Sequence, residues 1–121
     1  MTAACLTLLA QRRGAIWPWC KTGRRILVEA FPAAQLKYWD LPYQGYNGSG
    51  SQAKKARAEI INFLRQKVEL SDSRKRCVLE SADALDAVIC AFAAMAVTEG
   101  YLVLQAPKVF SEFEGWIAVH Q

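Results

Sequence analysis

The chain has 121 residues, of which 53% are hydrophobic and 21% are charged, and its formal net charge is +4. This length predicts one domain, spanning residues 1–121, and the composition excludes a disordered chain. The net charge is too small to indicate a dedicated nucleic-acid binder.

The cysteines and the histidine argue against a zinc site. The four cysteines are Cys5, Cys20, Cys77 and Cys90, no two of which form a C-x-x-C pair, and the one histidine is His120. Zinc sites usually place their ligands in such closely spaced pairs. We therefore expect four free thiols in a reducing compartment, which predicts a cytoplasmic protein.

The apolar runs predict neither a secretory signal nor a membrane span. The stretch over residues 3–10 has no basic residue before it and is followed by Arg12 and Arg13, the reverse of a signal peptide. The wholly apolar run from Ala87 to Val97 is too short to cross a bilayer, so it predicts a buried core helix. We expect no membrane partner.

The first third of the chain predicts two helices with a strand between them. The first helix is expected over residues 2–13. Segment 25–31 is β-branched and apolar, which predicts a strand buried on both faces, and segment 32–39 predicts a short helix with proline at its first position. Glu29 lies near the end of the strand, where a carboxylate must reach water, a cation or a metal.

A glycine-rich loop is predicted over residues 41–50. The helix after it is expected over about 52–68, with Ser49 or Ser51 as its cap. Segment 70–79 predicts a further short helix, with a strand around Cys77 as the alternative.

The last predicted helix spans residues 82–98. Ser81 is a favourable N-cap, and Gly100 is a favourable C-cap. Residues 115–119 predict a closing strand.

Two carboxylates at the start of this last helix are the most informative feature of the sequence. Asp83 and Asp86 are three residues apart, so a helix places them on one face, where like charges repel unless a cation lies between them. Asp83 is also explained as a partner of the helix dipole in the first turn, with Asp86 ending the exposed face. Together with Glu29, the pair forms a plausible site for a hard cation, Mg²⁺ or Mn²⁺.

Four segments in order resemble one family. They are residues 28–34, 41–46, 83–91 and 114–117. They are similar to the C-terminal half of the DUF429 family, which is described as predicted RNase H-like nucleases. The D-x-x-D-A pattern at Asp83 also resembles the last acidic motif of Holliday-junction resolvases, which share that fold superfamily.

The resemblance implies an α/β chain with an incomplete RNase H-like fold, in which a few strands pack with several helices. It implies that Glu29, Asp83 and Asp86 are catalytic residues and metal ligands for Mg²⁺- or Mn²⁺-dependent cleavage of phosphodiesters. It also suggests contacts with nucleic acid at Tyr46 and, by a looser match, at Arg57.

The sequence departs from this family pattern in two ways. Asn47 stands where the family often has a lysine, and the first acidic residue of the chain is Glu29, so the aspartate of a first strand has no counterpart. The sheet is expected to have an open edge, which a second copy of the chain or another partner would cover. We expect a homodimer.

Three functions remain open. The first is a metal-dependent RNase H-like nuclease, or a remnant of one. The second is a non-catalytic dimeric binding or assembly module, with an aromatic interface formed by Trp17, Trp19, Trp39, Tyr43 and Tyr46. The third is a nucleic-acid-binding protein that uses exposed tyrosines and the basic clusters at residues 12–13, 21–25, 54–57 and 74–76.

Overall fold

The computed structural model of this chain describes residue 11 and residues 15–17, 26–103 and 117–121. The helix predicted over residues 2–13 lies outside this part except for Gln11, as do Cys5, Trp19 and Cys20. The closing strand predicted over residues 115–119 is described only from Ile117 onward.

The described strands are short. Strand β1 (Ala15–Ile16) pairs in parallel with β2 (Ile26–Leu27), with Ala15 opposite Ile26. Two isolated bridges add further extended segments: Glu29 pairs in parallel with Ile117, and Leu102 pairs antiparallel with His120.

The strand predicted over residues 25–31 is therefore too long, and it is not buried on both faces. Residues 26–28 are half-buried, and Glu29 and Phe31 are exposed. Pro32 starts the next helix and thereby ends the extended segment at Phe31.

Helix α2 (Pro32–Tyr38) follows with proline in its first turn, as predicted. The side chain of Gln35 is 2% exposed. Its amide donates to the carbonyl of His120 at 2.9 Å and its oxygen accepts from the backbone N–H of His120 at 2.7 Å. These two hydrogen bonds hold the segment 117–121 against α2.

Helix α3 (Ser51–Leu64) starts and ends earlier than predicted. Its N-cap is Gly50, which has no side chain to accept a hydrogen bond, so neither Ser49 nor Ser51 is the cap. The backbone turns at Arg65, and the predicted extension to residue 68 is absent.

Helix α4 (Asp72–Glu80) confirms the helical prediction and excludes a strand around Cys77. Ser71 is its N-cap, and the backbone N–H of Arg74 donates to the Ser71 hydroxyl at 3.4 Å.

Helix α5 (Ala82–Glu99) confirms the predicted bounds to within one residue. The Ser81 hydroxyl accepts from the N–H of Ala84 at 3.2 Å, and Gly100 ends the helix with a φ of 82°. Both caps satisfy backbone groups that the helix itself leaves unpaired.

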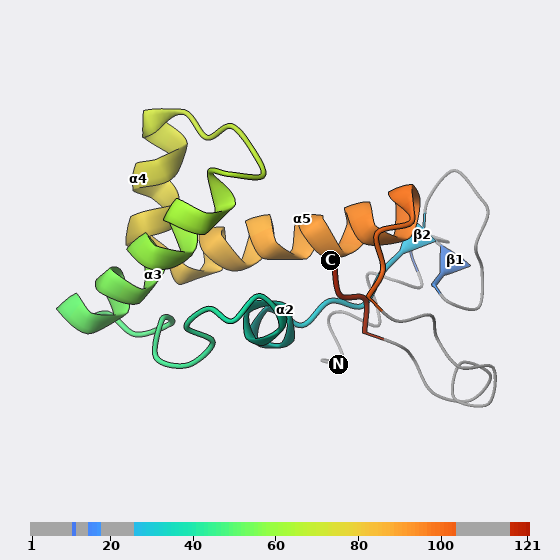
Figure 1. Ribbon diagram of the computed structural model, residues 1–121, viewed down its shortest axis with the longest axis horizontal. Coiled ribbons are helices and arrows are strands. Elements are labelled where there is room, and N and C mark those ends of the chain that lie inside the picture. Colours follow the sequence, from blue (N-terminus) through green and yellow to red (C-terminus); the bar gives the residue numbers. More distant parts are fainter. Residues whose placement is uncertain (1–10, 12–14, 18–25, 104–116) are drawn as a thin grey trace.

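Helix α5 crosses the molecule and joins two cores (Figure 1). Its N-terminal half packs with α2, α3 and α4, and its C-terminal half packs beside β1 and β2. The first core contains Leu36, Tyr46, Ile60, Ile61, Leu64, Val78, Leu85, Ile89 and Phe92. The second contains Trp17, Ala93, Ala96, Leu102 and Ala118.

The prediction that α5 is buried all round from Ala87 onward is wrong for one of its faces. Ala87, Ala91 and Ala94 are exposed, and Met95 is 40% exposed. No single described helix is long and apolar enough to span a membrane, although α4 and α5, bent by 113°, pass that test as a pair.

The described architecture is rich in helices and contains little sheet. An RNase H-like fold and a single domain over residues 1–121 stay predictions, because two short strands and two bridges define no sheet order that is specific to one fold.

Gly100 offers a direct test of how α5 ends. Replacing it with alanine is expected to lower the free energy of unfolding by about 1 kcal/mol, because a side chain strains the left-handed backbone. No atom lies within 4 Å of the added Cβ, so the loss reports the backbone alone. Gly48→Ala is the control, since its Cβ meets only ordinary contacts, at 3.5 Å from the Ala53 side chain and 3.6 Å from the Gly45 carbonyl. Equal stability of both variants in urea unfolding would contradict this account.

Candidate functional site

Two hollows lie beside the first turns of α5, where the loop over residues 41–50 faces the helix. The first hollow, of about 440 Å³, is lined by Asp86 on α5, by Tyr46 in the loop and by Phe31 before α2. The second, of about 470 Å³, is lined by Asp83 on α5 and by residues of the loop, of α3 and of α4. Asn47 lines both hollows, so they are neighbours that share one wall.

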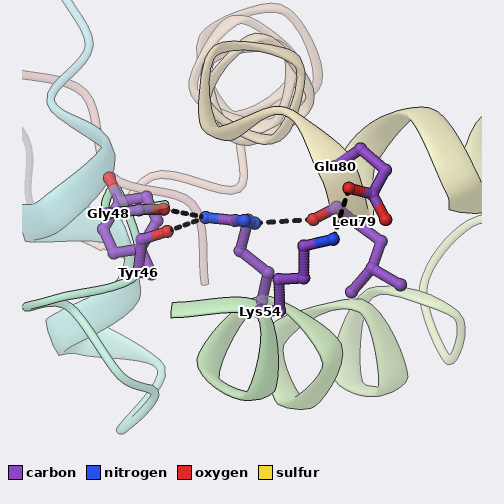
Figure 2. Close-up of polar contacts among 6 residues, drawn as sticks. Tyr46, Gly48, Lys54, Leu79 and Glu80 are labelled. Carbon is purple, nitrogen blue, oxygen red and sulfur yellow. Dashed lines mark hydrogen bonds and ion pairs between the residues drawn. The ribbon is translucent and has the colours of Figure 1, made fainter. Parts of the chain in front are cut away.

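Arg57 holds this loop in place. Its side chain is on α3 and is only 2% exposed. The Nη1 group donates to the carbonyls of Tyr46 and, at 2.9 Å, of Gly48. The Nε group donates to the carbonyl of Leu79 at 2.7 Å. Figure 2 shows Tyr46 and Gly48 on one side of these bonds and Leu79 on the other.

The position of Arg57 gives it a role inside the fold, and its contact with nucleic acid stays a prediction. A buried guanidinium needs hydrogen-bond partners, and the loop and the end of α4 supply them within the chain. Arg57 therefore positions the loop. The sequence contains a signal for this burial, because Arg57 shares a helix face with the apolar residues Ala53, Ile60 and Leu64. An arginine on an apolar helix face is usually paired inside the fold.

Tyr46 joins the loop to α5. Its ring is 6% exposed, and its hydroxyl donates to Oδ1 of Asp86 at 2.8 Å. Burial, followed by the hydrogen bond to Asp86 and the negative charge of Asp86, raises the pKa of Tyr46 well above its ordinary value of about 10. A buried Tyr46 is not a free stacking surface for a base.

The charge of Asp86 also reaches Cys90, one helical turn further along α5. Burial and then the Asp86 carboxylate raise the pKa of the Cys90 thiol. Cys77 and Cys90 are both free thiols, and Cys77 is exposed.

An exposed ion pair lies at the rim of the second hollow. Lys54 Nζ is 2.6 Å from Glu80 Oε2, as Figure 2 shows. The hydrogen bond from Lys54 lowers the pKa of Glu80. Because both side chains are exposed, this pair contributes little to stability.

Asp83 is exposed in the first turn of α5. Within the described part of the chain, no hydrogen bond or ion pair joins its carboxylate to another side chain. Its position fits a partner of the helix dipole. It lines the second hollow, whereas Asp86 lines the first.

Glu29 is exposed and contributes its backbone to the sheet, where its carbonyl accepts from the N–H of Ala118 at 3.0 Å. Residues 26–103 and 117–121 contain no group of three Asp, Glu, His or Cys side chains close enough to hold a metal ion. Glu29, Asp83 and Asp86 are thus not gathered as a ligand set for Mg²⁺ or Mn²⁺. The donor set of the described residues does not fit the predicted metal centre.

Most of the aromatic residues predicted to form an interface belong to the cores. Trp17 and Tyr46 are buried, and Trp39 packs at 5.2 Å from the ring of Phe63. Tyr43 is the exception among those described, at 39% exposed, and it lines the first hollow.

The model of one protein family matches residues 2–109, and it is described as "Protein of unknown function (DUF429)". No curated protein and no solved structure matches the chain.

The raised pKa of Tyr46 predicts how the tyrosines titrate. The pKa of Tyr46 is higher in the folded chain than in the unfolded chain, so protonated Tyr46 stabilises the folded chain. This stabilisation is fully present below about pH 10 and is lost as the pH rises above that value. Among the four tyrosines, we expect one to ionise late when tyrosinate absorbance is followed with pH. Tyr46→Phe should remove this late step.

Tyr38→Phe is the matched control, because Tyr38 is 50% exposed. It should leave the late step in place. A late step that survives in Tyr46→Phe would contradict the assignment.

Proposed function

This chain belongs to the DUF429 family, and from that premise we propose that it is a non-catalytic, dimeric binding module related to RNase H-like nucleases. It retains an acid-bearing helix and the loop that faces it, but the described residues form no catalytic metal centre. The observation that carries this proposal is that the described residues do not bring Glu29, Asp83 and Asp86 together.

The hydrogen bond from Tyr46 supports the proposal that Asp86 remains ionised without a bound cation. One oxygen of Asp86 already accepts from the Tyr46 hydroxyl at 2.8 Å, and a charge-assisted hydrogen bond of this kind stabilises a carboxylate. The loop that carries Tyr46 is fixed by Arg57, so the donor is held in place before any ligand arrives.

A hard cation requires more oxygen ligands than this arrangement supplies. Mg²⁺ demands near-octahedral geometry, and sites of this kind use carboxylates together with substrate phosphates and waters. Asp83 and Asp86 line different hollows, and among the described residues Glu29 belongs to no group of three possible metal ligands. The expected metal affinity of the chain alone is therefore low.

The binding surface in this proposal is the apolar rim of the first hollow. Phe31 is 55% exposed and Tyr43 is 39% exposed, and both line this hollow. Ile117, which is 40% exposed, pairs with Glu29 two residues before Phe31. Aromatic residues grouped in this way favour a protein interface, which in this proposal is formed with a second copy of the same chain.

A metal-dependent nuclease is the second candidate. The exposed carboxylate of Asp83, which has no partner within the described part, favours it. On this reading a further ligand comes from outside the described residues or from another chain, and substrate phosphates complete the site.

One experiment separates the two candidates. The purified chain is incubated with single- and double-stranded DNA and RNA in Mg²⁺ or Mn²⁺, beside Asp83→Asn and Asp86→Asn. We expect no cleavage above the level of these variants, and a mass by light scattering of twice the 13.5 kDa chain. Asp40→Asn is the charge-matched control, because Asp40 is exposed and lines neither hollow.

Cleavage that persists in Asp40→Asn but disappears in Asp86→Asn would contradict the proposed non-catalytic module and support the metal-dependent nuclease. A strict monomer would contradict the assembly role. Phe31→Glu tests the interface itself, since a charge at this rim should shift the dimer toward monomer.

A further inference from the structure

Positive charge is concentrated where α3 and α4 are joined. We call residues 65–76 the hairpin tip. It holds five basic residues and two acidic ones, a net charge of +3 in a chain whose total is +4. The basic residues are Arg65, Lys67, Arg74, Lys75 and Arg76, and the acidic residues are Glu69 and Asp72.

The basic side chains border two hollows. The larger, of about 460 Å³, is lined by Arg65, Arg74 and Lys75, with Glu69 also on its wall. The smaller, of about 170 Å³, is lined by Arg65, Lys75 and Arg76. Arg65 and Lys75 line both, so the positive side chains form one continuous ridge between the hollows.

Most of this charge is not neutralised within the described residues. Lys75 Nζ forms an ion pair with Asp72 at 2.9 Å. Arg65, Arg74 and Arg76 are exposed, and none of them pairs with a carboxylate in the part of the chain that the structure describes. Within the described residues, three guanidinium groups thus have no ion-pair partner and can bind an anion.

The hairpin tip is separate from the acidic hollows beside α5. In Figure 1, the connection between α3 and α4 lies at the end of the molecule opposite β1 and β2, and it projects away from α5. Its hollows share no lining residue with those of Asp83 and Asp86. A polyanion bound at the tip avoids repulsion by those carboxylates.

We propose that the hairpin tip binds the phosphate backbone of nucleic acid without reading its sequence. Guanidinium groups bind phosphate oxygens through two parallel hydrogen bonds, and a ridge of them suits a ligand with evenly repeated phosphates. Val68 is the one large apolar side chain exposed within the tip, which is too little apolar surface for insertion into a membrane. This binding goes beyond the proposed module and does not depend on it.

Fluorescence anisotropy of a labelled duplex, titrated with the full chain, tests this inference. Arg65→Gln/Arg74→Gln is expected to weaken binding by about tenfold or more at low salt, and to make the salt dependence shallower by roughly two units, one for each lost phosphate contact. Glu69→Gln is expected to tighten binding, because it removes a negative charge from the wall of the larger hollow. Circular dichroism confirms that each variant is folded.

Lys37→Gln/Lys55→Gln is the matched control, because it removes two exposed positive charges from α2 and from the first turns of α3. It should leave most of the affinity intact. An equal loss in both double variants would overturn the site, since net charge alone would then explain binding. Binding to vesicles that contain phosphatidylserine, with no binding to nucleic acid at low salt, would also overturn it.

Discussion

The buried guanidinium of Arg57 is the constraint on which the candidate site depends. It donates to the carbonyls of Tyr46, Gly48 and Leu79, and so ties the 41–50 loop and the end of α4 to one point on α3. A buried charge is costly unless it is paired or hydrogen-bonded. The loop carbonyls meet that requirement. If the loop moved away from α3, the buried guanidinium would lose these hydrogen-bond partners.

This constraint decides what the acidic residues of α5 can do. With the loop held against the helix, the Tyr46 hydroxyl reaches Asp86, and the two hollows open on either side of Asn47. The two carboxylates that helical spacing places on one face therefore have different surroundings: Asp86 accepts a hydrogen bond from Tyr46, and Asp83 is exposed. This difference supports the proposal of a binding module, and the basic hairpin tip is a second, independent surface.

Local sequence signals predicted the described helices well, whereas contacts between distant segments could not be predicted from the sequence. Ser81 and Gly100 fix the ends of α5 because both caps act within one turn of the chain. The partners of Arg57 are carbonyls, which every residue carries, so no side-chain pattern marks them. The exposed face of α5 was missed for a related reason, because an all-apolar helix does not reveal which side its neighbours leave open.

The most direct test of this account is the tyrosine titration of Arg57→Lys. Lysine keeps the positive charge but cannot bond three carbonyls in the planar geometry of a guanidinium. If Arg57 positions the loop, Tyr46 loses its place beside Asp86, and its late ionisation moves toward the ordinary tyrosine value of about 10. Arg65→Lys, on the exposed turn after α3, should leave the late step unchanged. A folded Arg57→Lys chain that keeps the late step would contradict the account.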